Sequence, residues 1–170
     1  MKIVPTMTVA LALGLAATVA FADEVRVTVA FPQPERYTDL RASCVSRDAD
    51  TRALLGELEA YVKATTATRL APGQRIEITV TNIDMAGELE TWRGPGRCDT
   101  RIVNDVYPPR IDLTFRLLGA DGTGAREGRR ELRDVNFLSH AAPATADHLR
   151  HEKALLRDWL ERELRGRSSS

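Results

Sequence analysis

Apolar and polar side chains alternate in three separate segments of this chain, and a period of two is that of a β-strand with one buried face. The segments span residues 25–31, 76–81 and 111–117, and the second strand runs on into Asn82-Ile83-Asp84. A glycine-rich turn at 119–124 leads from the third into a fourth strand at about 125–134, so the last two strands form a hairpin. The fourth strand is densely charged. We therefore expect it at a sheet edge, where charge opposes edge-to-edge aggregation, and not as a binding patch.

Two other segments have the three-to-four-residue period of an amphipathic helix. The first runs from about Asp50 to Thr66, and the second follows Pro143, with Trp159 on its apolar stripe and expected in the core. The order of elements is therefore β-α-β-β-β-α. This order predicts an α+β fold, a four-stranded mostly antiparallel sheet with two helices packed on one face, because that arrangement buries the single apolar face of every strand.

Residues 1–22 have the features of a secretory signal peptide. Lys2 precedes a long uncharged run, and Ala20-Phe21-Ala22 supplies an A-x-A cleavage pattern. Cleavage there leaves a single domain at 23–170, which we expect in the periplasm or outside the cell. An uncleaved membrane anchor is the alternative interpretation, although polar and helix-breaking residues dilute the run.

The charge balance excludes two classes of partner. Loss of Lys2 with the signal peptide reduces the 24 basic side chains to 23, against 24 acidic ones. A chain this close to neutral has no field that attracts nucleic acid or anionic lipid, and we expect no stable membrane insertion after cleavage. The sequence also lacks a phosphate loop, a G-x-S-x-G elbow, an H-E-x-x-H motif and a C-x-x-C pair. We therefore expect no cofactor and assign no catalytic residue.

Cys44 and Cys98 are the only cysteines, and an exported chain with two cysteines has one possible intramolecular pairing. We expect a disulfide, which would stabilise the fold by about 4 kcal/mol on the chain-entropy model. Two unrelated buried thiols are the alternative.

Four separated segments carry a family resemblance. They are Tyr37-Thr38-Asp39, the run from Thr81 to Gly87, the run from Arg101 to Ile111, and Glu152-Lys153-x-x-Leu156-x-Asp158-Trp159. Together they resemble the proteobacterial exported family catalogued as domain of unknown function 3016. The resemblance implies an exported single-domain bacterial protein and carries no activity, cofactor or catalytic residue. The cysteine pair is not part of the resemblance.

The long connection at 84–110 holds the most unusual local chemistry, because carboxylates, guanidinium groups and aromatic rings are the materials of a polar ligand site. The candidate ligand-binding residues are Asp39, Asp84, Glu88, Trp92, Arg101, Tyr107 and Arg110. The structural interpretation is favoured over a ligand site: Asp84 pairs with Arg110 or Arg101, and Tyr107-Pro108-Pro109 only sets an extended entry into the next strand.

His148, His151 and Glu152 are spaced for one helix face, as a metal site requires. Further ligands are missing nearby in sequence, so we expect no metal there and interpret these residues as a solvated helix start.

Three classes of function remain open. The first is a non-enzymatic binding or interaction module that uses the 84–110 loop to hold a small polar ligand or an envelope protein. The second is a small hydrolase built on Asp39, Asp84 and Glu88, two of which would have to lie in a cleft with separated pKa values. The third is a structural component of an envelope assembly or stress response.

Overall fold

The computed structural model describes residues 26–43, 45–89, 101–122, 124, 126–139 and 147–165. The elements are β1 (Val27–Ala30), the 3-10 helix η1 (Pro34–Arg36), α1 (Asp48–Ala67), β2 (Arg75–Asp84), β3 (Glu88–Leu89), β4 (Arg101–Ile102), β5 (Arg110–Leu118), β6 (Arg126–Arg133) and α2 (Arg150–Leu164). The predicted α+β class is confirmed, with the two short strands β3 and β4 added to the expected order.

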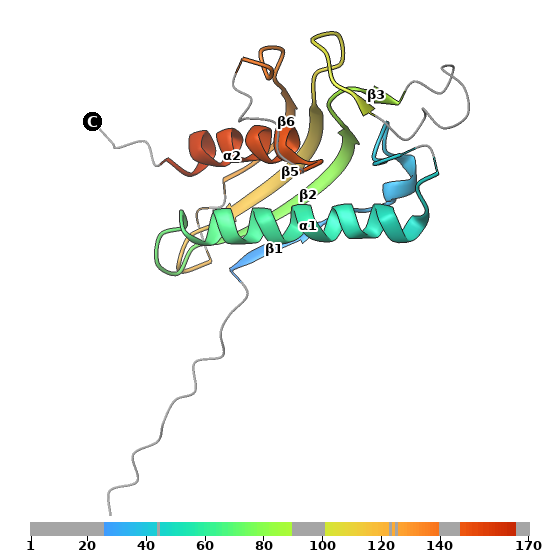
Figure 1. Cartoon of the computed structure of the whole chain (residues 1–170). Coiled ribbons are helices and arrows are strands. Elements are labelled where there is room, and N and C mark those ends of the chain that lie inside the picture. Colours follow the sequence, from blue (N-terminus) through green and yellow to red (C-terminus); the bar gives the residue numbers. More distant parts are fainter. Residues whose placement is uncertain are drawn as a thin grey trace, which may run out of the picture.

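The main sheet has four strands in the order β1-β2-β5-β6 (Figure 1). β2 and β5 pair antiparallel, as do β5 and β6, and the charged β6 lies at the edge as predicted. β1 and β2 are parallel, so the sheet is mixed. The parallel pair follows from the chain path, because α1 carries the chain back to the starting end of the sheet before β2 begins.

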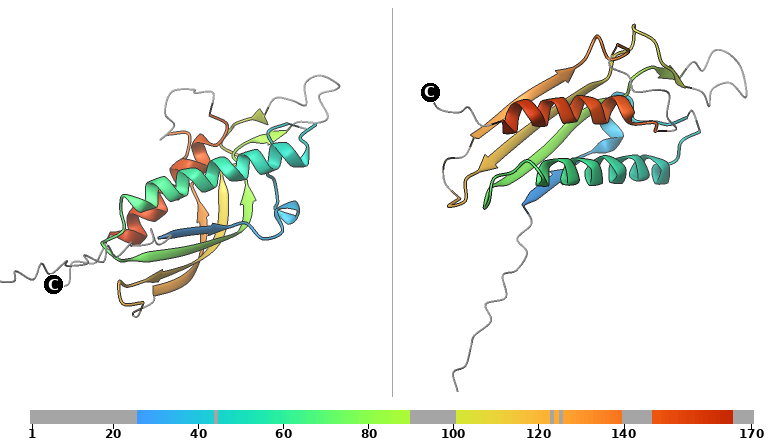
Figure 2. Two further views of the ribbon diagram at one scale, coloured as in Figure 1. Left: turned by 90° about the horizontal axis from the view of Figure 1, so that it is seen from below. Right: turned by 60° about the vertical axis from the view of Figure 1, so that its left-hand side comes forward.

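Both helices lie on the same face of this sheet, as predicted (Figure 2). α1 packs against β1, α2 packs against β6, and the helices contact each other between them. No helix in the described part of the chain is both long and apolar enough to span a membrane.

The core fills the space between the helices and the sheet. α1 contributes Leu58 and Val62, each 1% exposed, and α2 contributes Trp159, which is 2% exposed as expected. The Trp159 ring meets the Phe115 ring of β5 edge-on at 5.7 Å between centroids. Such an edge contact adds about 0.5–1.5 kcal/mol beyond the area buried. The open face of the sheet is polar, with Thr114 and Arg116 of β5 exposed.

Candidate functional site

A pocket of about 360 Å³ opens where β2 ends and β5 begins, and we call it the Asp84 pocket. Five of the seven candidate ligand-binding residues line it: Asp39, Asp84, Glu88, Tyr107 and Arg110. The sequence therefore located a real concentration of polar side chains. Of the other two, Arg101 bonds directly to Asp39, and Trp92 lies outside the described residues, as do Cys44 and Cys98.

A β-bulge in β2 determines where the Asp84 side chain points. Ile78 and Val80 face the core, so an unbroken strand would bury Asp84 on that same face. The register with β5 shifts between Val80 and Asn82. After the shift Ile83 is the buried residue, at 1% exposed, and Asp84 is half-buried at the pocket. The extra residue thus re-aims one carboxylate, which is a common role of bulges near functional sites.

Asp39 is held beside Asp84 by backbone hydrogen bonds. The Asp39 N–H donates to the Ile83 carbonyl at 3.0 Å, and the Met85 N–H donates to the Asp39 carbonyl at 3.1 Å. These bonds form a parallel bridge that places Asp39 next to Asp84. Two carboxylates from distant parts of the sequence therefore share one pocket.

Arg101, from β4, holds Asp39 and the adjoining backbone in place by hydrogen bonds. Its Nη2 donates to Asp39 Oδ2 at 2.8 Å and to the Arg41 carbonyl at 2.8 Å, while its Nη1 donates to the Gly87 carbonyl at 2.7 Å. The side chains of Arg101 and Asp39 are only 11% and 10% exposed. Both groups therefore hold the pocket together. This is the structural role that the sequence analysis considered for the charged residues of the 84–110 loop.

Asp84 has no such partner. Its expected pairing with Arg110 or Arg101 is not found: within the described residues its carboxylate makes no hydrogen bond and no ion pair. Arg110 instead lies 3.3 Å from Asp112 Oδ1 and 3.9 Å from Glu131 Oε2. Burial raises the pKa of Asp84, the carboxylates of Asp39 and Glu88 raise it further, and Arg101 and Arg110 oppose them.

Glu152, from α2, holds the backbone that follows β2 by a hydrogen bond. Its Oε1 accepts a hydrogen bond from the Ala86 N–H at 2.8 Å, and the residue is fully buried. Burial raises the pKa of this carboxyl. Glu152 Oε2 and Arg101 Nε are both buried without a hydrogen-bond partner.

The interpretation of this region as a solvated helix start is therefore wrong for His151 and Glu152, although His148, just before α2, is exposed as expected. Glu152 is 0% exposed and His151 only 6%. The signal was present in the sequence, because position 152 lies three residues after Leu149 and four before Leu156, on the apolar stripe of the helix. The polar character of these residues favoured the opposite interpretation, that they are exposed to solvent. Within the described residues, His, Cys, Asp and Glu form no group that could hold a metal ion.

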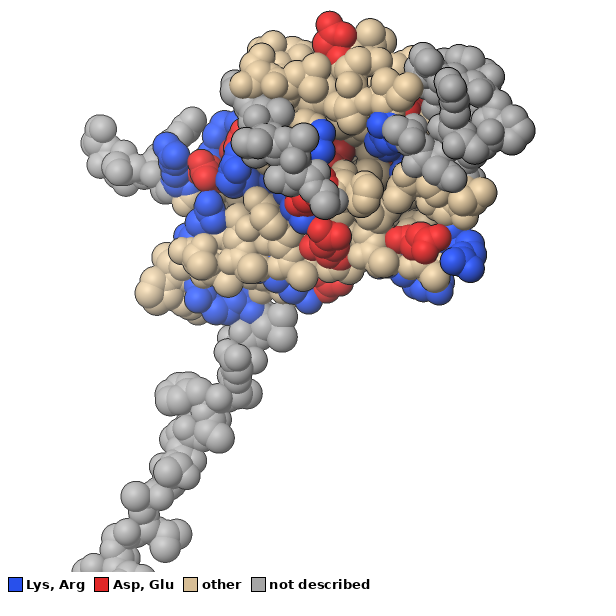
Figure 3. Space-filling model, in the orientation of Figure 1, with Lys and Arg blue, Asp and Glu red and all other residues tan. Residues whose placement is uncertain are grey.

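Charges of both signs are interspersed over the helical face of the molecule (Figure 3). Arg41 and Arg133 also line the Asp84 pocket, and sequence analysis singled out neither. Arg133 is the last residue of β6, so this edge strand does contribute one side chain to the pocket wall.

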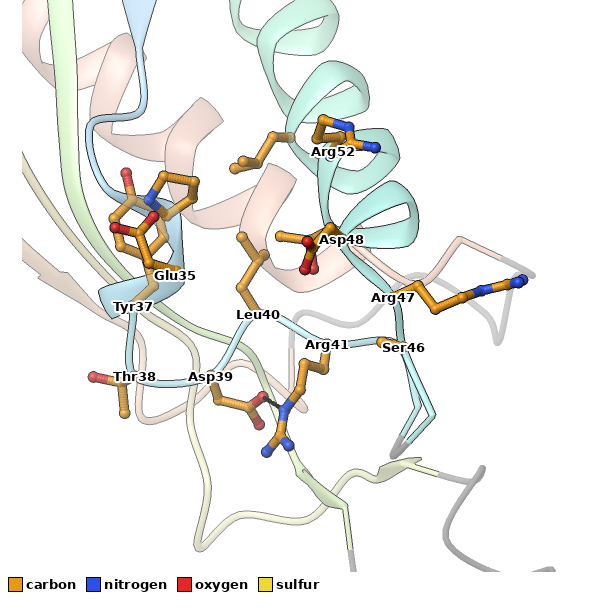
Figure 4. Close-up of a pocket in the computed structure, with 13 residues that line it drawn as sticks. Glu35, Tyr37, Thr38, Asp39, Leu40, Arg41, Ser46, Arg47, Asp48 and Arg52 are labelled. Atoms are coloured by element: carbon orange, nitrogen blue, oxygen red, sulfur yellow. Dashed lines mark ion pairs between the residues drawn. The ribbon is translucent and has the colours of Figure 1, made fainter.

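A second pocket, of about 620 Å³, lies between η1 and the first turns of α1 (Figure 4). We call it the Asp48 pocket. It shares Thr38, Asp39 and Arg41 with the Asp84 pocket, so the short segment 38–41 separates the two. Leu40 and Leu55 give it an apolar part.

Three of the four segments behind the family resemblance line the Asp84 pocket: the first contributes Asp39, the run from Thr81 contributes Asp84, and the run from Arg101 contributes Arg110. The fourth contributes Glu152, which bonds to the backbone of Ala86. The family model described as protein of unknown function (DUF3016) matches residues 25–162. The chain belongs to this family. No curated protein and no solved structure matches it. Membership of DUF3016 names no activity, so the function has to be argued from the geometry of the site.

Proposed function

We propose that this chain is an exported, non-enzymatic binding module whose Asp84 pocket takes a positively charged group of a small polar ligand or of an envelope protein. The observation that carries the proposal is the half-buried Asp84 carboxylate, which has no ion-pair partner within the described residues. A carboxylate in a cleft without a counterion is an unused binding group, since burying it unpaired costs free energy that a cation would recover.

The surroundings of Asp84 favour a cation over an anion. Two neighbouring carboxylates, Asp39 and Glu88, raise the pKa of Asp84, and Arg110 is already engaged by Asp112. Arg41 and Arg133 also line the pocket but are exposed to solvent, and the two carboxylates act on the pKa of Asp84 more strongly than Arg101 and Arg110 do. An ammonium or guanidinium group in the pocket would relieve this repulsion and form charge-assisted hydrogen bonds, worth about 1.5–3 kcal/mol each.

The exposed rim of the pocket adds apolar contact. Val106 is 68% exposed and Tyr107 is 38% exposed, and both line the Asp84 pocket. Aliphatic and aromatic side chains beside carboxylates suit the stem and the charged end of a lysine or arginine side chain.

We place this module in the periplasm or outside the cell, on the basis of the signal-peptide features of residues 1–22. Export also supports a Cys44–Cys98 disulfide. Thiol titration of the denatured, unreduced protein should find no free thiol; two free thiols per chain would overturn the disulfide.

The test of the binding function is a titration with N-acetyl-arginine amide, followed by amide NMR shifts of the chain purified after export. We expect shifts at Gly87 and Tyr107, and at least tenfold weaker binding by Asp84→Asn, which corresponds to about 1.4 kcal/mol. Asp158→Asn makes the same chemical change at a half-exposed position of α2, away from the pocket lining, and should bind as the wild type does. Equal affinity of the wild type and Asp84→Asn would contradict the proposal.

One observation favours the hydrolase as a second candidate. The raised pKa of Asp84 beside Glu88 is the pattern of a carboxyl that acts as a general acid. Asp39, the third proposed member, is engaged by Arg101, so only Asp84 and Glu88 would be available. Cleavage of a peptide or glycoside by the wild type, lost in both Asp84→Asn and Glu88→Gln, would establish this candidate in place of simple binding.

A further inference from the structure

We propose that the Asp84 pocket and the Asp48 pocket are two subsites of one groove, which binds an extended peptide with basic side chains at both ends. This inference rests on the proposed function of the Asp84 pocket and adds the size and class of the ligand. It begins with the wall between the two pockets, formed by the segment 38–41.

Asp39 lies in this wall and belongs to both pockets. Arg101 binds its Oδ2, but its Oδ1 is buried without a hydrogen bond, although the side chain is only 10% exposed. The nearest cation is Arg41 Nε, at 3.5 Å, on a side chain that is 52% exposed. Figure 4 shows this Arg41–Asp39 pair below the Asp48 pocket. A buried acceptor covered only by a half-exposed arginine can accept a hydrogen bond from a ligand that crosses the wall, once Arg41 turns outward.

The far end of the groove also presents a carboxylate, in a lining that includes three arginines. Asp48, the first residue of α1, points into the Asp48 pocket, whereas the guanidinium groups of Arg47 and Arg52 point away from it (Figure 4). Within the described residues Asp48 makes no hydrogen bond and no ion pair. Among the described residues, carboxylates without an ion pair thus lie in each pocket, the exposed Asp48 in one and the half-buried Asp84 in the other, with Asp39 Oδ1 between them.

A peptide fits these features better than a simple polycation. The N–H groups of an extended backbone provide a donor for Asp39 Oδ1, and the buried Leu40 and Leu55 offer apolar contact inside the Asp48 pocket. The two volumes, about 620 and 360 Å³, together reach the upper end of the range for ligand pockets. A single arginine side chain would leave the larger of them empty.

The experiment uses the series Ac-Arg-(Ala)n-Arg-NH2, with one to four alanines, against N-acetyl-arginine amide. An extended backbone lengthens by about 3.3 Å per residue. We expect one length to bind about tenfold more tightly than the single arginine, because the second subsite is then filled intramolecularly. That peptide should shift the amides of both Thr51 and Gly87. Spermidine, which has three positive charges against the peptide's two but no amide groups, should lack this gain.

Asp48→Asn should reduce the affinity of the best peptide to that of the single arginine, without changing the affinity for the single arginine. Asp50→Asn is the matched control, because it removes a carboxylate from the same helical turn outside the pocket. It should weaken the capping of α1 but retain the peptide's gain.

Three results would overturn the inference while leaving the proposed function in place: no gain at any length, a gain unaffected by Asp48→Asn, or an equal gain with spermidine. Failure of the wild type to bind either the single arginine or any peptide of the series would overturn both.

Discussion

Arg101 Nη2 lies 2.8 Å from Asp39 Oδ2 and joins β4 to the segment that follows β1, 62 residues away in sequence. The same guanidinium holds the Gly87 and Arg41 carbonyls. One buried cation is thus used to fix the two walls of the Asp84 pocket to each other. Asp84, next to Asp39 in the sheet, forms no ion pair with any described residue, and this difference between two adjacent carboxylates is the basis of the proposed binding site.

Arg101→Met should reduce the free energy of unfolding by about 3–5 kcal/mol, because it leaves the Asp39 carboxylate buried without its partner. Urea unfolding measures the change. Arg129→Met is the control: Arg129 is 66% exposed and pairs with Glu131 at 3.6 Å, so its loss should change stability by less than about 1 kcal/mol. Similar losses in the two variants would show that Arg101 does not hold the pocket together.

Asp84→Asn and Asp39→Asn make the same chemical change at neighbouring positions and should have opposite effects on stability. Asp39→Asn removes the counterion of Arg101 and should destabilise the fold by about 3 kcal/mol. Asp84→Asn should leave the fold equally or more stable at neutral pH, because the pKa of Asp84 is raised in the fold and its charged form is therefore penalised. Urea unfolding at pH 7 separates the two. A clear loss of stability in Asp84→Asn would indicate that its carboxylate has a structural partner after all.

Glu152→Gln should become progressively more stabilising, relative to the wild type, as the pH rises. Burial raises the pKa of Glu152, so its favourable contribution to folding is fully present below the pKa of the unfolded chain and is lost as the pH passes the folded pKa. Glutamine imitates the neutral form and keeps an oxygen to accept the hydrogen bond from Ala86. Thermal melts between pH 4 and pH 8 follow the difference.

Glu127→Gln, which removes an exposed carboxylate from β6, corrects these melts for the general effect of losing one negative charge. A difference between Glu152→Gln and the wild type that stays constant with pH, after this correction, would argue against a neutral buried carboxyl.

Gly87→Ala should destabilise the fold by about 1–2 kcal/mol or more. Gly87 has a φ of +80°, and a Cβ there would lie 2.5 Å from the Ile102 carbonyl oxygen, so both backbone strain and a clash oppose alanine. Gly56→Ala, in the exposed part of α1, meets no atom within 4 Å and should stabilise the fold by about 0.5–1 kcal/mol. Chemical denaturation of both variants checks this, and tolerance of alanine at both positions would refute the close approach of β4 to Gly87.

The fold could be predicted because its strands and helices each have one apolar face. The alternation in 76–81 and 111–117 marked the buried face of the two central strands, and the charge of 125–134 marked the edge strand. The parallel pairing of β1 with β2 was not predicted, because periodicity within a strand contains no information on the direction of its neighbour.

The sequence also predicted most of the residues that line the pocket, but not which of their charged side chains form ion pairs with each other. Five of the candidate residues line the Asp84 pocket. However, Arg110, one of the partners expected for Asp84, forms its ion pair with Asp112 instead. Pairing depends on the bulge after Val80, which shifts the inward-facing positions by one residue. The sequence carries a trace of this shift, because the apolar residue after Val80 is Ile83, but the alternation does not show which cation lies beside Asp84. The contribution of Glu152 was missed because its place on the apolar stripe was given less weight than its charge.

The most direct test of the proposed binding site is the pKa of the Asp84 carboxyl, measured from its ¹³Cγ chemical shift without and with saturating N-acetyl-arginine amide. The unpaired carboxylate predicts a pKa above the ordinary 3.8 in the free protein. Binding of the guanidinium should lower that pKa, because an opposite charge favours the ionised form. A pKa at or below 3.8 in the free protein, or one that does not move when the ligand is added, would contradict the account.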